Sequence, residues 1–179
     1  APELIMETLQ CDTLRLFTDR RKFAQKGDRH KVLFFYDHSC SKCKLETILL
    51  GNLLQTEDYP IDFYAVYTGD DKQAWESYVA ERFDISPVNS RIYHLWDPTM
   101  DSDFQRKYGV VQTPRLFLVR PDGVIKGRGL NARALSLMLD EIFTSPDLNY
   151  GKPESEAYFD QLMTLFPPAE GEAPSAAVQ

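Results

Sequence analysis

The 179-residue chain is predicted to be an α/β protein in which helices cover both faces of a mostly parallel sheet. Strand-sized apolar runs alternate along the chain with segments of helical periodicity, which is typical of consecutive β-α units. A Pro-Asp-Gly turn joins the last two strand-like runs, and it predicts an antiparallel hairpin at the sheet edge. With 43% hydrophobic and 26% charged residues, the composition is that of a soluble globular domain.

The first part of the chain predicts a helix, a strand and a second helix. Residues 14–26 place apolar side chains near one helical face and arginines on the other. Residues 32–37 begin as a continuous apolar run, which predicts a buried strand. Residues 41–55 form an amphipathic helix whose apolar side chains follow the spacing i, i+3, i+4, i+8: Leu45, Ile48, Leu49 and Leu53.

The rest of the chain continues the alternation. Further strands are predicted over residues 61–68, 91–96, 115–119 and 124–128. Asp70 and Asp71 are suited to cap a helix after the first of these strands, and Gly109 is suited to end a short helix over residues 104–108. A closing helix carries apolar side chains at i, i+3, i+4 and i+7: Leu135, Met138, Leu139 and Ile142.

The charge and the hydropathy pattern exclude two classes of function. The net charge is −7, and an acidic chain attracts polyanions poorly, so nucleic acid is not expected as a partner. The longest clear apolar run, residues 32–36, is far shorter than the roughly 20 residues of a membrane-spanning helix. We therefore expect no transmembrane segment in this chain.

The chain is predicted to have four parts. Residues 1–29 are a helical lead-in packed on the domain, residues 30–145 are the domain itself, and residues 146–166 contain a C-terminal amphipathic helix. Residues 167–179 lack bulky apolar groups apart from one valine and are predicted to be a disordered tail. The chain begins at Ala1 without a signal-peptide pattern, so it is either a processed product or part of a longer protein.

The three cysteines are the main chemical signal. Cys40 and Cys43 form a Cys-x-x-Cys motif in the first turn of the helix that follows the 32–37 strand. A helix N-terminus stabilises anions through unpaired N–H groups and its dipole, so the Cys40 pKa should be lowered. Cys43 lies one turn further in and should be the resolving thiol, and Lys42 between them would favour the thiolate.

Two other uses of the cysteines compete with a redox pair. Half of a zinc site has the same spacing, but zinc needs four ligands and the remaining candidates show no pairing at ligand spacing: Cys11, His30, His38 and His94. Two inert core cysteines fit poorly with the edge of a sheet. Cys11 is read as a helix-start or packing residue, with a regulatory or intermolecular disulfide as the alternative.

Two stretches of the chain resemble the TlpA/ResA-like thioredoxins. Residues 31–43, Lys-Val-Leu-Phe-Phe-Tyr-Asp-His-Ser-Cys-Ser-Lys-Cys, are similar to their strand and active-site loop. Residues 108–119, Tyr-Gly-Val-Val-Gln-Thr-Pro-Arg-Leu-Phe-Leu-Val, are similar to their second motif, which contains a cis-proline. The Pro-Asp-Gly-Val-Ile hairpin after it also matches, so the resemblance covers roughly residues 30–143.

The resemblance implies a thioredoxin-like three-layer α/β/α fold with a central mixed sheet and a TlpA-type helix-strand insertion between residues 68 and 113. It implies that Pro114 is cis and that the backbone of Thr113 binds an extended substrate chain beside the cysteines. Glu46 matches the family's active-site glutamate and would handle a proton for Cys43, although a solvated helix glutamate is an equal alternative.

Three departures from the family pattern matter for the chemistry. Ser39 stands where tryptophan is usual before the first cysteine, and the residues between the cysteines include no proline. Phe34 stands where thioredoxin itself has a buried aspartate, which leaves Glu46 as the carboxylate that could replace it. His38 either tunes Cys40 electrostatically or is an exposed loop histidine.

These observations predict a thiol-disulfide oxidoreductase that works through Cys40 and Cys43 without a metal or another cofactor. The resemblance implies a reductase of protein disulfides, exported to the periplasm or cell envelope, with disulfide or dithiol proteins and an upstream redox protein as partners. The alternative is a thioredoxin-like binding module of a longer envelope protein with little redox activity. A peroxiredoxin is disfavoured because the chain has no Thr-x-x-Cys motif.

Overall fold

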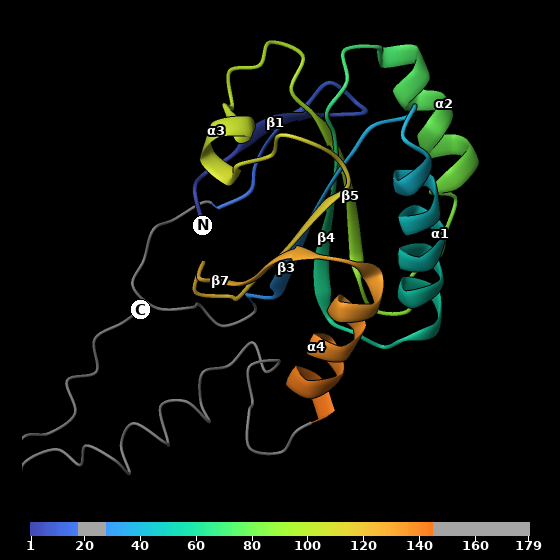
Figure 1. The fold of residues 1–179 in the computed structure, drawn as a ribbon, viewed down its shortest axis with the longest axis vertical. Coiled ribbons are helices and arrows are strands. Elements are labelled where there is room, and N and C mark those ends of the chain that lie inside the picture. Colours follow the sequence, from blue (N-terminus) through green and yellow to red (C-terminus); the bar gives the residue numbers. More distant parts are fainter. Residues whose placement is uncertain (18–27, 145–179) are drawn as a thin grey trace, which may run out of the picture.

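The computed structural model describes residues 1–17 and 28–144. Its described strands form one mixed sheet in the order β2-β1-β5-β4-β3-β6-β7 (Figure 1). The strands are β1 (Ile5–Thr8), β2 (Thr13–Arg15), β3 (His30–Tyr36), β4 (Ile61–Tyr67), β5 (Arg91–Trp96), β6 (Arg115–Val119) and β7 (Ile125–Leu130). The helices are α1 (Ser41–Thr56), α2 (Lys72–Arg82), α3 (Phe104–Tyr108) and α4 (Ala132–Thr144).

Parallel strands make the centre of the sheet and antiparallel strands make its edges. β3 pairs parallel with β4, and β4 pairs parallel with β5. β6 and β7 add antiparallel strands on one side, while β1 and β2 add an antiparallel pair beside β5. The predicted insertion corresponds to α2 and β5, which lie in sequence between β4 and α3. The thioredoxin-like α/β fold class predicted from the sequence is confirmed.

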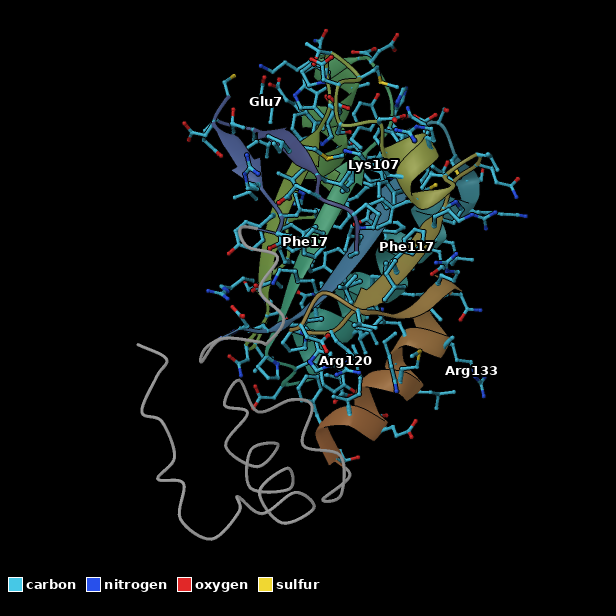
Figure 2. All side chains as sticks on the ribbon, turned by 90° about the vertical axis from the view of Figure 1, so that its left-hand side faces the viewer. Glu7, Phe17, Lys107, Phe117, Arg120 and Arg133 are labelled. Atoms are coloured by element: carbon cyan, nitrogen blue, oxygen red, sulfur yellow. The ribbon has the colours of Figure 1, made fainter. Side chains whose placement is uncertain are left out.

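The sheet has an apolar core on each face. Helices α1, α2 and α4 pack on one face, and α3 packs on the other together with residues of the N-terminal strands (Figure 1). Strand β3 shows why its apolar run is continuous, because Phe34 faces the first core while Leu33 and Phe35 face the second. Phe117 of β6 lies within the second core (Figure 2).

The sequence prediction is wrong at the N-terminus. Residues 13–15 form strand β2, which includes the start of the predicted 14–26 helix, and β1 lies earlier in the predicted helical lead-in 1–29. Met6 pairs with Leu14 across this hairpin, and Leu14 and Leu16 alternate with arginine, which is strand rather than helix periodicity. The remainder of the predicted helix lies in residues 18–27, and the predicted C-terminal helix and tail lie beyond residue 144, all outside the described residues.

Helix α1 is confirmed, but of its predicted apolar stripe only Leu53 packs against the core. Leu45, Ile48 and Leu49 are exposed, and the residues that α1 buries lie on another side of the helix: Cys43, Thr47, Leu50, Gly51 and Leu54. The closing helix α4 does bury its predicted stripe, including Leu135 and Leu139. Both helices therefore show the predicted helical spacing of apolar residues, but only in α4 does the apolar stripe mark the buried face.

Candidate active site

Cys40 and Cys43 lie at the junction of β3 and α1, at the carboxyl end of the central parallel strands. β3 ends at Tyr36, and a short loop leads to Cys40, which is the N-cap residue of α1. The backbone N–H of Cys43 donates a hydrogen bond to the Cys40 sulfur over 3.2 Å. The first turn of α1 is thus capped by a sulfur atom in place of the usual side-chain oxygen.

The two thiols have opposite environments. Cys40 is partly exposed and Cys43 is fully buried. Partial burial disfavours the Cys40 thiolate, but hydrogen bonds from the Cys43 thiol and the Cys43 N–H outweigh it, so the pKa of Cys40 is lowered. Burial, followed by the hydrogen bond to Cys40, raises the pKa of Cys43 to about 12. Cys40 is therefore the thiol that ionises first.

The segment that contains Thr113 and Pro114 lies next to Cys40 of the Cys-x-x-Cys motif. The Thr113–Pro114 peptide bond is cis. The Cys40 thiol donates to the carbonyl oxygen of Thr113 over 3.7 Å, across 73 positions of sequence. This arrangement leaves a backbone segment before strand β6 next to the more exposed thiol.

The predicted tuning residues are oriented in different ways. The Nδ1 atom of His38 is 2.8 Å from the Tyr67 hydroxyl and 3.0 Å from a carboxylate oxygen of Asp37. The hydroxyl of Ser39 donates to the same carboxylate. His38 is thus held by Tyr67 and Asp37 at the loop, while Lys42 is exposed on the first turn of α1.

Glu46 joins α1 to α4. Its Oε2 atom accepts a hydrogen bond from the backbone N–H of Ala132 over 2.8 Å, at the start of α4. Among the described hydrogen bonds none joins Glu46 to Cys43. The predicted proton-handling role of Glu46 stays a prediction, and the structure adds a bridging contact that the sequence did not indicate.

Two polar residues behind Cys43 were missed in the sequence. The Thr47 hydroxyl donates to the Cys43 carbonyl oxygen over 2.8 Å and lies 2.7 Å from the Tyr78 hydroxyl of α2. The Tyr78 ring lies 4.9 Å from the ring of Tyr36, and the Cys43 side chain belongs to the same buried cluster. The available signal was the position of Thr47, four residues after Cys43 on the same side of the helix.

Cys11 lies outside this cluster. It is exposed in the turn between β1 and β2, where its φ of 64° places it in the left-handed region. The Lys72 ammonium donates to its sulfur over 3.4 Å. The expectation of a helix-start position for Cys11 is wrong, because the residue belongs to a hairpin turn.

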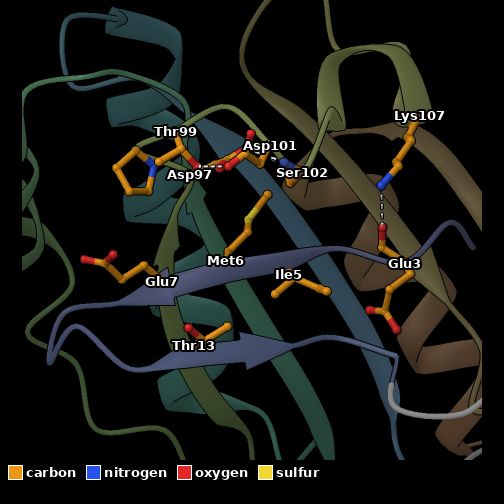
Figure 3. Close-up of a pocket in the computed structure, with 11 residues that line it drawn as sticks. Glu3, Ile5, Met6, Glu7, Thr13, Asp97, Thr99, Asp101, Ser102 and Lys107 are labelled. Carbon is orange, nitrogen blue, oxygen red and sulfur yellow. Dashed lines mark hydrogen bonds between the residues drawn. The ribbon is translucent and has the colours of Figure 1, made fainter.

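A separate cavity of about 360 Å³ lies against β1 and the loop after β5 (Figure 3). Its lining includes acidic side chains, among them Glu7 and Asp101, but neither Cys40 nor Thr113.

Within residues 1–17 and 28–144, no three His, Cys, Asp or Glu side chains lie together as a metal site would require. In the same ranges no helix has the length and apolar character needed to cross a bilayer.

Comparison with known proteins gives the family. The model of a thioredoxin-like domain matches residues 16–142, which include both motifs and the whole described sheet except β1 and β2. The chain belongs to the thioredoxin-like domain family. A search of curated proteins returns no significant match.

Solved structures of other thioredoxin-like proteins have the same fold. The thioredoxin domain of a thiol-disulfide oxidoreductase from Bacteroides vulgatus is 21% identical, with a TM-score of 0.63 over 79% of this chain and 94% of that one. StoA from Bacillus subtilis is 14% identical, with a TM-score of 0.56 over 75% and 94% of the two chains. These likenesses confirm the predicted thioredoxin-like fold.

Proposed function

We propose that this protein is a thiol-disulfide oxidoreductase in which Cys40 is the nucleophile and Cys43 the resolving thiol. The observation that carries the proposal is the contrast between a partly exposed Cys40 with a lowered pKa and a buried Cys43 with a raised one. Only a thiolate attacks a disulfide, so the exposed thiol with the lower pKa starts the reaction. The structure from Bacteroides vulgatus is that of a thiol-disulfide oxidoreductase, which supports the same activity.

The reaction has two exchange steps. The Cys40 thiolate attacks one sulfur of a substrate disulfide, which forms a mixed disulfide and releases the other substrate sulfur as a thiolate. Cys43 then loses its proton and attacks the Cys40 sulfur, which releases the second substrate thiolate and leaves a Cys40–Cys43 disulfide. Two electrons pass from the protein to the substrate, and the released thiolates take up the two protons. Run in reverse, the same steps oxidise a substrate dithiol.

Thr113 and Pro114 supply the surface on which the substrate backbone is held. The carbonyl of Thr113 lies beside the Cys40 sulfur, so an extended substrate chain paired with this segment would present its disulfide to Cys40. Lys42 is exposed on the first turn of α1, and its positive charge stabilises the Cys40 thiolate as it forms. His38 acts through the electrostatics of the loop, and Glu46 accepts the proton that Cys43 must lose.

The substrates are protein disulfides, and we propose the periplasm or cell envelope as the place of action. Both parts of this proposal rest on the resemblance to TlpA/ResA-like thioredoxins, which favours a reductase and whose members are typically exported. An upstream redox protein would return the Cys40–Cys43 disulfide to the dithiol form. A redox titration of the pair assigns the direction, because a reductase requires a lower potential than its substrates.

The second candidate is a thioredoxin-like binding module that holds a partner at the Pro114 face with little redox chemistry. Its support is the unusual loop, which has Ser39 before Cys40 and no proline between the cysteines. The two candidates differ in what they require of the Cys40 sulfur. The binding module keeps its function without that atom, and the oxidoreductase does not.

The deciding experiment is dithiothreitol-driven reduction of insulin disulfides by the wild type, Cys40→Ser and Cys11→Ser. We expect Cys40→Ser to fall to the rate of dithiothreitol alone and Cys11→Ser to keep the wild-type rate. Cys11→Ser is the matched control because it removes a thiol that lies outside the proposed site. A wild-type rate no higher than that of Cys40→Ser would leave the binding module as the better description.

A further inference from the structure

Helix α1 presents an apolar surface to solvent next to the cysteine pair. Leu45, Ile48 and Leu49 are 57%, 53% and 43% exposed, and their spacing places them together on the outer face of the helix. We call these three residues the α1 stripe. Single exposed apolar residues are ordinary, but a group of three on one helix face indicates a contact surface.

Positive charges flank this stripe. Lys42 and Lys44 occupy the turn before it, and the single acidic residue of α1, Glu46, uses its carboxylate to accept the Ala132 N–H. Arg133 follows Ala132 and projects outward from α4 (Figure 2). A segment that covered the stripe would therefore be favoured by apolar side chains on one face and acidic side chains beside them.

The chain itself contains such a sequence after α4. Within residues 155–166, Tyr158, Leu162 and Leu165 are spaced i, i+4 and i+7. Glu156 and Asp160 lie in its first half. We propose that residues 155–166, named here the C-terminal segment, dock on the α1 stripe with these acids toward Lys42 and Lys44.

The connection is long enough for this docking. Helix α4 begins at Ala132, in contact with Glu46 of α1, and ends at Thr144, about 18–20 Å further along at the rise of an α-helix. Figure 1 shows α4 next to the lower part of α1. The ten residues 145–154 span up to about 33–36 Å when extended, which exceeds the distance back along α4.

A second copy of the chain is a poorer occupant. In a two-fold dimer built on the α1 stripe, the same surface would face itself. Lys42 and Lys44 of one copy would then lie close to the same lysines of the other, and like charges at an interface oppose association. The C-terminal segment brings the opposite charge, and its covalent attachment raises its effective concentration at the stripe.

Docking there would place the C-terminal segment more than one helical turn from Cys40, because Leu45 follows Cys40 by five positions. The inference goes beyond the proposed oxidoreductase function and does not depend on it, because the contact would form whether or not the cysteines are redox-active.

Hydrogen exchange measured by mass spectrometry on the full 179-residue chain tests the proposal. Peptides from residues 155–166 should exchange about tenfold more slowly in the wild type than in Ile48→Asp or Leu162→Asp. Leu137→Asp is the matched control, since it adds the same charge at a position of α4 that is 61% exposed. This control should retain the slow exchange, and the result should be the same in a Cys40→Ser background.

Three results would overturn the proposal. Exchange of the wild-type segment as fast as that of a synthetic peptide of residues 155–166 would mean that it is not docked. Slow exchange that survives Ile48→Asp would place the segment elsewhere, and slow exchange that grows with protein concentration would place it on another copy. If Ile48→Asp lowers the melting temperature, Leu162→Asp decides, because it leaves every residue of α1 unchanged.

Discussion

Helices α1 and α4 lie side by side on the same face of the sheet but begin in different ways. At the start of α4, Asn131 accepts the Ala134 N–H and Glu46 accepts the Ala132 N–H, each over 2.8 Å. At the start of α1, the corresponding partner is the sulfur of Cys40. The oxygen atoms that cap α4 stabilise the helix by accepting its first N–H groups. At the start of α1 the N–H group donates to a sulfur atom, so the same kind of hydrogen bond stabilises a reactive thiolate.

The two helices also differ in the use of their apolar faces. Both carry apolar residues at helical spacing, but α4 buries Leu135, Leu139 and Ile142 while α1 leaves Leu45 and Ile48 in solvent. In α1 the buried face is the one that carries Cys43 and Leu50. In α1 the face that carries Cys43 packs against the sheet together with Leu50, so the regular stripe of apolar side chains remains in solvent.

The largest expected effect concerns the two thiols of α1. Two variants each keep one of these thiols: Cys43→Ser keeps Cys40, and Cys40→Ser keeps Cys43. At pH 7 the Cys40 thiol should react with iodoacetamide at least about a hundredfold faster than the Cys43 thiol. The reason is that the pKa of Cys43 is raised to about 12 while the pKa of Cys40 is lowered. The rate for Cys40 should level off at a lower pH than that for Cys43, which should still increase above pH 9. Mass spectrometry of the alkylated protein, with Cys11→Ser in both variants, gives the rates.

Equal rates, or a faster reaction at Cys43, would remove the assignment of Cys40 as the nucleophile. They would also remove the functional difference between the caps of α1 and α4. A Cys40 rate that still rises tenfold for each pH unit above pH 9 would show that the sulfur cap does not stabilise the thiolate.

The next effect concerns the two sides of α1. Leu50→Ala removes a fully buried side chain and should lower the free energy of unfolding by about 2–5 kcal/mol, whereas Ile48→Ala, on the exposed side, should change it by less than about 1 kcal/mol. Urea denaturation measures both. Leu139→Ala should resemble Leu50→Ala, since α4 buries that residue completely. A large loss for Ile48→Ala would contradict the described orientation of α1.

The smallest effect concerns the caps of α4. Asn131→Ala should cost about 1 kcal/mol of unfolding free energy, because it leaves the Ala134 N–H without its side-chain acceptor. Glu46→Ala should cost about as much, and Glu46→Gln less, since glutamine keeps an oxygen that can accept the Ala132 N–H. Urea denaturation again gives the values.

Glu46→Gln also separates the two roles of this residue. If Glu46 accepts the Cys43 proton, the variant should shift the pH profile of insulin reduction while its unfolding free energy stays near that of the wild type. An unchanged profile would assign Glu46 to the contact between α1 and α4 alone.

Much of the fold was predictable because its signals are local. The apolar run of β3 and the Asp71 cap of α2 were read from neighbouring residues, as was Gly109, whose φ of 65° ends α3. The β1–β2 hairpin was missed because its strands are short and the arginine-rich stretch after it has helical spacing. In the site, the two cysteines were found from their spacing, whereas Thr47 and Tyr78 were missed because they meet only when α1 packs against α2.

The sequence by itself determined the order of the elements and the position of Cys40 at a helix start, because periodicity and capping depend on residues within a few positions of one another. The tertiary structure alone decided which side of α1 is buried, how Glu46 meets Ala132 and how closely Thr113 approaches Cys40. These contacts join residues 73 or more positions apart, and they follow from the packing of whole helices on the sheet. The fold class could therefore be predicted from the sequence, whereas the difference in burial and pKa between Cys40 and Cys43 also depends on the packing of α1 on the sheet.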